Sequence, residues 1–162
     1  YCIAHDQYIV RIAPEHFTVY HPPTWGLSNP HAIAAAWAFK ASVVPGLGLG
    51  FAATFFARHG SLPKASAKSV FLGAIVVILL TELSAGLSGI WAHRTGRGLF
   101  PDAWYPSNSP RMIITQTIQL TAYLAASLYS ALWLIWIYRW RMRKSRLAFA
   151  GQQEGQEWLM SS

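Results

Sequence analysis

The chain has 162 residues, a formal net charge of +7 and a mean hydropathy of +0.27, and only 12 % of its residues are charged. Soluble domains carry about 25 % charged residues, whereas here the charges gather at the ends of long apolar segments. This pattern excludes an ordinary soluble domain, and it also excludes a nucleic-acid-binding face, where basic residues alternate with aromatic ones. It predicts one all-α membrane domain over residues 1–146 and a polar tail over residues 147–162.

The first 30 residues are polar, aromatic and rich in proline. Residues 8–12 and 17–20 have a β-favouring composition and are separated by a proline, which predicts a small hairpin. A second loop with several glycine and proline breakers covers residues 93–111. We expect the two regions, 1–30 and 93–111, to form a small irregular or β cap on one side of the membrane.

Three apolar segments are expected to cross the bilayer as helices, at residues 31–57, 69–92 and 112–138. At about 1.5 Å per residue each is long enough to span the hydrocarbon core. Pro45 removes a backbone donor and is expected to kink the first span. Ser42, Gly46 and Gly50 recur every fourth residue in that span, a pattern that lets another helix approach closely.

The distribution of Lys and Arg predicts the orientation of the chain. The short loop after the first span carries three basic residues, and the third span ends in a basic cluster of Arg139, Arg141, Arg143, Lys144 and Arg146. Both regions are therefore expected in the cytoplasm of a bacterium, with residues 1–30 and 93–111 on the periplasmic side of its inner membrane. Three arginines in the 93–111 loop weakly oppose this assignment.

Two ionisable side chains, Lys40 and Glu82, lie deep in the first and second spans at similar depth. Such residues are costly in lipid and are usually paired or functional. Consecutive spans joined by a short loop are expected to be antiparallel neighbours, so an intramembrane ion pair is predicted. It would fix the helix register or form part of a proton or ion path.

The third span carries polar residues on one helical face. They are Gln116, Gln119, Tyr123, Ser127 and Ser130. Amides and hydroxyls of this kind form interhelical hydrogen bonds in membranes. A polar face of the bundle is therefore predicted, and a lined polar cavity is the alternative.

Five histidines fall on the predicted periplasmic side, and three of them, His5, His16 and His21, are candidate metal ligands. Their spacing matches no metal motif, so surface or hydrogen-bonded histidines are the main expectation. A contact surface that changes with pH is a further alternative. Cys2 is the single cysteine and permits no internal disulfide.

A set of residues near the N-terminus resembles a family signature. The residues are His5-Asp6-Gln7, Arg11, Glu15-His16-Phe17-Thr18 and His21-Pro22-Pro23. The family consists of small uncharacterised bacterial polytopic membrane proteins, and the resemblance covers roughly residues 1–68, including the turn at 62–64. Residues 41–45 depart from it, because paired tryptophans are usual there. The resemblance implies a hydrophobic helix upstream of Tyr1 and four spans in all, and it implies no activity, cofactor or catalytic residue.

No serine–histidine–acid arrangement, phosphate loop or HExxH helix is visible. The first functional hypothesis is a non-enzymatic accessory or structural subunit of a larger bacterial membrane complex. Its partners would be the lipid bilayer and other membrane subunits, with no cofactor and no nucleic acid. A respiratory or photosynthetic assembly is a candidate host, although no residue points to either. The alternative is a small proton- or ion-coupled transporter that uses Lys40 and Glu82, and the third is a metal-binding enzyme of the outer face.

Overall fold

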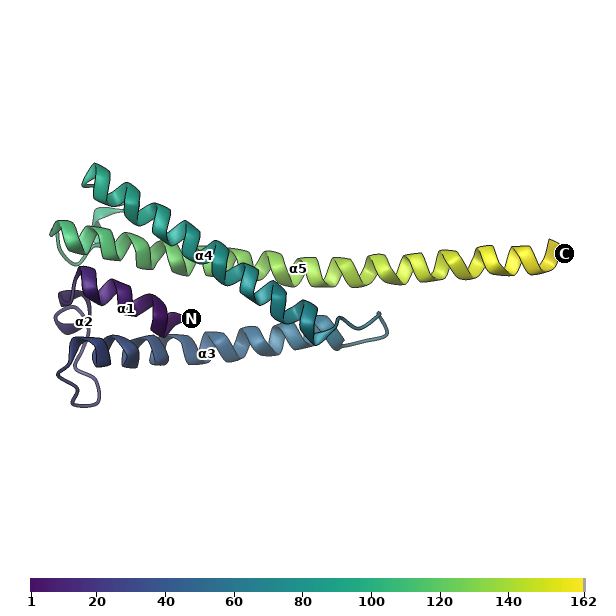
Figure 1. Ribbon diagram of the computed structural model, residues 1–162, viewed down its shortest axis with the longest axis horizontal. Coiled ribbons are helices and arrows are strands. Elements are labelled where there is room, and N and C mark those ends of the chain that lie inside the picture. The colour runs from purple at the N-terminus through teal and green to yellow at the C-terminus, as the bar shows by residue number, and fades with distance from the viewer. Residues whose placement is uncertain (162) are drawn as a thin grey trace.

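Three long helices dominate the computed structural model, which describes residues 1–161, with side chains up to residue 150. They are α3 (Pro30–Arg58), α4 (Ala67–Thr95) and α5 (Pro110–Ser161) (Figure 1). Each is long and apolar enough to cross a membrane. The prediction of an all-helical fold with three helices that could span a membrane is confirmed, and the three helices indicate a membrane protein.

The N-terminal region is helical, so the predicted β hairpin is wrong. Residues 2–12 form α1 (Cys2–Ile12) and residues 15–18 form α2 (Glu15–Thr18), and no strand occurs among residues 1–161. The buried residues of α1 are His5, Asp6, Ile9 and Val10, which share one face of a helix. Packing of this face overrides the β-favouring composition. The two ends of the predicted 93–111 loop belong to the long helices α4 and α5, and the loop between them contains the short helix η1 (Asp102–Trp104).

The ends of the long helices follow from local chemistry. The Asn29 side chain accepts hydrogen bonds from the backbone N–H groups of His31 and Ala32, and Pro30 occupies the first helical turn. Helix α4 ends at Gly96, whose φ of 66° is a left-handed conformation that glycine adopts without strain. Pro45 lies inside α3, which runs without interruption from Pro30 to Arg58.

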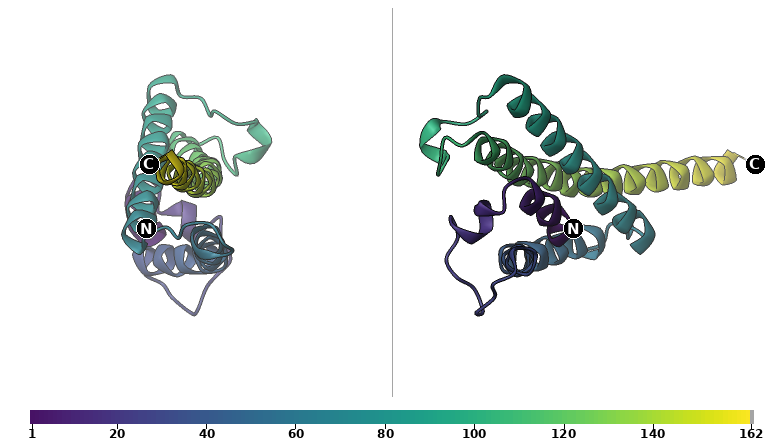
Figure 2. Two further views of the ribbon diagram at one scale, coloured as in Figure 1. Left: turned by 90° about the vertical axis from the view of Figure 1, so that its right-hand side faces the viewer. Right: turned by 60° about the vertical axis from the view of Figure 1, so that its left-hand side comes forward.

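Helices α4 and α5 form the most extensive contact in the molecule, whereas α3 packs mainly against α1 and, less extensively, α5. Small residues bring α4 and α5 together: a Cβ at Gly73 would collide with the Trp133 ring, and one at Gly89 with Ile118. The predicted pairing of α3 with α4 is limited, because α1 lies between α3 and the α4–α5 pair (Figures 1 and 2). The short helix α1 therefore holds α3 apart from α4 and α5 at one end of the bundle.

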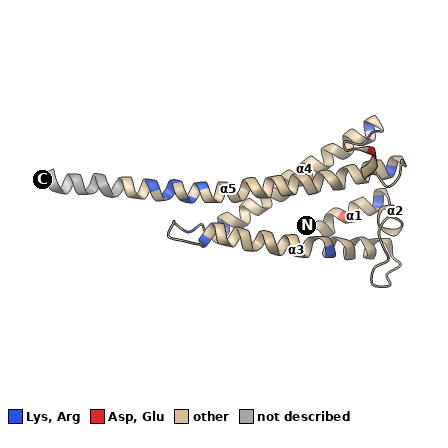
Figure 3. Ribbon diagram, turned by 180° about the vertical axis from the view of Figure 1, so that it is seen from behind, with Lys and Arg blue, Asp and Glu red and all other residues tan. Residues whose placement is uncertain are grey.

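The bundle has two distinct ends. At one, which we call the cap end, α1 and α2 pack on α3, α4 and α5 around Ile9, Val10 and Phe17. At the other, the basic end, the loop between α3 and α4 meets α5 around Ala57, Trp133 and Ile137. Figure 3 shows several Lys and Arg residues along α5 beyond this loop.

Helix α5 continues well past the predicted end of the third span at Tyr138 and runs to Ser161. The predicted polar tail over residues 147–162 thus begins within this helix. The side chains of residues 151–162, which include most of that tail, lie outside the described part of the structure.

Candidate functional site

Polar and titratable side chains gather where α1 and α2 meet α4 and α5 near the cap end. We call this group the polar cluster, and its members are His5, Asp6, Tyr8, His16, Glu82, Thr115, Gln119 and Tyr123. The two short helices supply half of it, so the cluster depends on the N-terminal region folding into the bundle. Polar groups inside a membrane bundle are costly unless they are paired, which makes the cluster the main candidate for a functional site.

His5 connects α1 to α4 at the centre of the cluster. Its Nδ1 lies 2.6 Å from Glu82 Oε1 and 3.2 Å from the Tyr8 hydroxyl. Its Nε2 is buried and has no hydrogen-bond partner among the described residues. Glu82 therefore has an imidazole partner on α1, and its side chain keeps 34 % of its surface exposed.

The predicted Lys40–Glu82 ion pair is not formed. The Lys40 ammonium donates a hydrogen bond to the Thr24 hydroxyl and lies over the rings of Trp25 and Trp37, 4.8 and 5.0 Å from their centroids. The physical reason is the position of α1, which separates α3 from α4 and presents His5 to Glu82. The long Lys40 side chain reaches back toward the cap end, as lysines in membrane helices commonly do.

His16 is held in one tautomer by its surroundings. Thr115 Oγ1 donates to the backbone carbonyl of Arg111, so His16 Nδ1 donates to Thr115 across a distance of 3.1 Å. Next to it, His21 Nδ1 donates to the His16 carbonyl at 2.7 Å, and the two rings lie 5.5 Å apart. Burial, together with the nearby His21 and His5, lowers the pKa of His16 to about 4, so this imidazole is neutral at pH 7.

Asp6 is only 4 % exposed, and its Oδ1 has no hydrogen-bond partner. Burial raises the pKa of Asp6 to about 7, while an interaction with the Gln119 side chain acts in the opposite direction. Gln119 is 9 % exposed and donates from Nε2 to the Tyr123 hydroxyl at 2.6 Å, whereas its Oε1 has no partner. The arrangement holds two buried oxygen acceptors without a donor.

A cavity of about 330 Å³ opens beside the cluster at the cap end. Its lining includes His16, His21, Gln119 and Tyr123, together with Trp104 from the 93–111 loop. The cavity is large enough for several water molecules. Gln119 and Tyr123 therefore connect buried Asp6 to a space that solvent can enter.

Only some residues of the predicted polar face of α5 form hydrogen bonds to other parts of the chain. Gln116 donates to the backbone carbonyl of Trp104 and Ser127 donates to the carbonyl of Tyr123 in its own helix. Residues outside the predicted face make the cross-links instead: Tyr129 pairs with Ser84 on α4, at 3.0 Å. Ser130, the last predicted member, is partly buried.

The glycine-rich face of α3 does not contact another helix of this chain. Gly46 and Gly50 have no other atom within 4 Å of the position that a Cβ would occupy. Ser42 makes a long hydrogen bond, 3.5 Å, to the carbonyl of Phe39 in its own helix. The close helix approach predicted for this face is therefore not seen among the described residues.

Sequence reasoning missed a buried arginine. Arg141 is 2 % exposed and donates four hydrogen bonds of 2.6–2.9 Å to the carbonyls of Phe56, His59, Leu62 and Pro63. It was grouped with the surrounding basic residues. Its position four residues after Ile137 and eight after Trp133 places it on the buried face of α5, and that periodicity is the signal that could have found it.

The predicted metal ligands are engaged elsewhere. His5 contacts Glu82, His16 contacts Thr115 and His21 contacts a backbone carbonyl. Within residues 1–150, no group of three or more His, Cys, Asp or Glu side chains is arranged to hold a metal ion.

The fold and the site together define an all-helical protein with three helices that could span a membrane and a buried polar cluster. No family model, curated protein or solved structure matches the chain.

Proposed function

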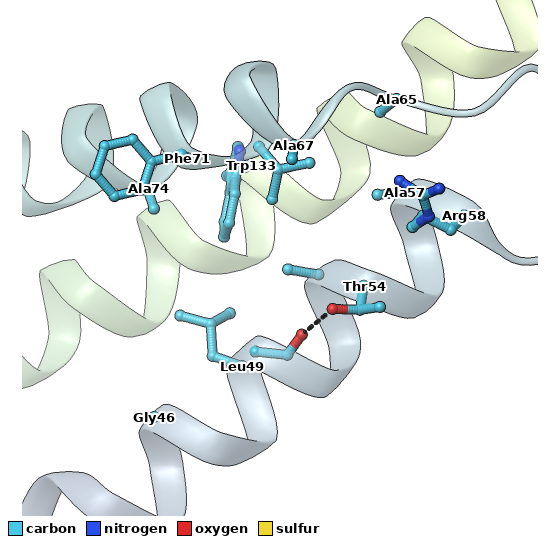
Figure 4. A pocket seen from close by; sticks show the side chains of 13 residues that line it. Gly46, Leu49, Thr54, Ala57, Arg58, Ala65, Ala67, Phe71, Ala74 and Trp133 are labelled. Carbon is cyan, nitrogen blue, oxygen red and sulfur yellow. Dashed lines mark hydrogen bonds between the residues drawn. The ribbon is translucent and has the colours of Figure 1, made fainter.

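We propose that the chain is a non-enzymatic accessory subunit of a larger membrane complex, and that a transmembrane helix of a partner subunit packs into an open groove between α3 and α4. The observation that carries this proposal is the groove itself. Its volume is about 460 Å³, and its wall is built from small and apolar side chains of both helices with Trp133 of α5 behind them (Figure 4).

The α3 wall of the groove is suited to close contact with a helix. Gly46 and Gly50 lie four residues apart, and Ala53, Thr54 and Ala57 continue the lining. Without large side chains, the backbone of a second helix can approach closely, which is how helices associate in lipid. A helix is the natural occupant at this depth because it satisfies its own backbone hydrogen bonds.

The packing of the three spans also supports a missing partner. Only 17 % of the most apolar window of α3, 17 % of that of α4 and 22 % of that of α5 is buried within the chain. The wedge formed by α1 fills the space between α3 and α5 only at the cap end. Beyond it, toward the basic end, the groove is open.

The orientation belongs to the same proposal. Arg58, Lys64 and Lys68 flank the α3–α4 loop, and the basic cluster of α5 follows on the same side of the bundle (Figure 3). By the preference of Lys and Arg for the cytoplasmic side, we place the basic end in the cytoplasm and the cap end in the periplasm of a bacterial inner membrane.

The transporter hypothesis loses its main support. It relied on a Lys40–Glu82 pair, and the two side chains have separate partners. The accessory-subunit proposal needs no such pair.

Filling the groove with one large side chain tests whether a partner helix occupies it. Gly50→Leu introduces a large group into the groove, whereas Gly48→Leu adds the same group to α3 outside the groove, and neither position has an atom of the chain nearby. We expect Gly50→Leu to remove the partner subunit from the complex extracted in mild detergent, as judged by native mass spectrometry. The Gly48→Leu complex should keep the wild-type mass.

A photo-crosslinking residue identifies the occupant. At position 49, which lines the groove, it should attach to a transmembrane helix of the partner, and at position 47, which lies outside the groove, it should label lipid. A lone oligomer of this chain, or lipid adducts at both positions, would overturn the proposal.

A further inference from the structure

Two buried acceptors in the polar cluster lack a donor. Asp6 Oδ1 and Gln119 Oε1 are both buried and both without a hydrogen-bond partner. A buried polar atom left unpaired loses its hydration without compensation, and an ionised carboxylate in that position loses still more. The Gln119 nitrogen is engaged by Tyr123, so its oxygen is the group that remains available.

We infer that Asp6 is a proton-binding site inside the bundle, and that it exchanges its proton with water from the cap-end cavity, which Gln119 and Tyr123 line. This goes beyond the proposed role of the chain as a subunit. The bound proton gives Asp6 a donor, because a neutral carboxylic acid has one O–H. The proton also removes the negative charge whose burial is costly.

The surroundings of Asp6 offer no fixed positive charge to hold it ionised. The titratable groups that interact with Asp6 are Cys2 and Tyr8 from α1 and Tyr123 from α5, and none of them is a cation. Lys40 is engaged with Thr24 and two indole rings, and His5 is engaged with Glu82. Neutralisation by a proton is then the least costly way to keep Asp6 buried.

The cap-end cavity brings solvent close to Asp6. Gln119 interacts with Asp6, donates to the Tyr123 hydroxyl and lines the cavity together with Tyr123. Burial raises the pKa of Asp6 to about 7, which places proton release and uptake near neutral pH.

The composition of the chain allows this site to be observed without mutating it. Asp6 and the exposed Asp102 are the only aspartates. In the Asp102→Asn variant, protein labelled with ¹³C at the aspartate side-chain carboxyl therefore gives one NMR signal, from Asp6. We expect this signal to titrate with a midpoint near pH 7, against roughly 3.9 for an exposed aspartate. A midpoint near 4 would overturn the inference.

A variant of Gln119 tests its influence on the site. Gln119→Met removes the side-chain amide at nearly constant volume. Because the interaction with Gln119 lowers the pKa of Asp6, the midpoint should rise above that of the wild type. A fall would show that Gln119 stabilises the protonated form and would overturn this assignment.

A change of salt separates a proton site from a cation site. The titration is repeated in sodium and in potassium salts, and equal midpoints support a proton site. A midpoint lowered by sodium alone would make Asp6 part of a cation site and overturn the inference.

Discussion

Arg141 donates its four hydrogen bonds to carbonyls that have few other partners. Phe56 lies in the last turn of α3, where backbone carbonyls lack helical donors, and Pro63 belongs to the loop that follows. A cation at a helix C-terminus is also favoured by the helix dipole. One side chain of α5 thus caps α3 and fixes the loop at the basic end.

Replacing this arginine should destabilise the basic end. Hydrogen bonds to a charged group contribute about 1.5–3 kcal/mol each, so we expect Arg141→Gln to lower the free energy of unfolding by roughly 3 kcal/mol or more. Arg143→Gln is the matched control, because Arg143 is exposed and has the same charge. Denaturant unfolding in detergent measures both. Equal losses in the two variants would contradict the capping role.

Burial of neutral His16 makes the folding stability of the protein depend on pH. Its folded pKa of about 4 lies below its ordinary value of 6.5. Between these pH values, His16 is protonated in the unfolded chain but neutral in the folded protein. Its contribution to the free energy of unfolding is therefore fully present above pH 6.5 and is lost as the pH falls toward 4. Asp6 acts oppositely, because its folded pKa of about 7 lies above its ordinary value of 3.8. Its contribution grows as the pH falls through this window.

The two contributions act in opposite directions in the wild type. His16→Gln removes only the first, so we expect this variant to gain stability relative to the wild type as the pH is lowered from 6.5 to 4. Unfolding at a series of pH values across this window in detergent provides the measurement. Parallel pH profiles for the two proteins would show that His16 is accessible to protons in the folded state.

At the scale of elements, the contact between α4 and α5 depends on a missing side chain. The Trp133 ring occupies the space that a Cβ at Gly73 would need, and an indole ring has few ways to move aside. Gly73→Ala should therefore overpack this contact and cost about 1–3 kcal/mol. Gly86→Ala, also in α4 but with open space around it, should leave stability unchanged or slightly increased. Thermal unfolding of the two variants checks this, and a Gly73→Ala protein as stable as Gly86→Ala would refute the argument.

The elements also show what sequence patterns predict and where they stop. Length and hydropathy were sufficient for the three spans, because each apolar run must be helical in lipid. They were not sufficient for α1, an 11-residue helix whose β-favouring residues, such as Ile9 and Val10, are packed on one face. The sequence of a short amphipathic segment is compatible with either a helix or a strand until its packing partner is known.

The candidate site was harder to predict for the same reason. His5, Glu82, Gln119 and Tyr123 were all singled out in the sequence, yet the pairing of His5 with Glu82 requires α1 to lie against α4. Nothing in the spacing of either residue specifies that contact. Asp6 was singled out only as part of the N-terminal signature, because its burial depends on the tertiary position of α1.

At the scale of the molecule, the space between the long helices is filled at the cap end and open toward the basic end. Helices α1 and α2 fill it at the cap end, where the polar cluster lies, and the groove between α3 and α4 lies closer to the basic end. The proposed proton site and the proposed partner groove are thus separate along the bundle. A partner helix in the groove would cover apolar surface without blocking the cap-end cavity.

The orientation of the whole molecule can be tested by labelling its two ends. The basic end should face the cytoplasm, because Lys and Arg near short loops are retained there. Ser28 lies at the cap end and Ala150 on α5 beyond the basic cluster, and both are exposed. In a Cys2→Ser background, Ser28→Cys should react with a membrane-impermeant thiol reagent added to intact cells. Ala150→Cys should react only after the cells are opened. Labelling of Ala150→Cys but not Ser28→Cys in intact cells would invert the orientation, and the proton exchanged by Asp6 would then come from the cytoplasm.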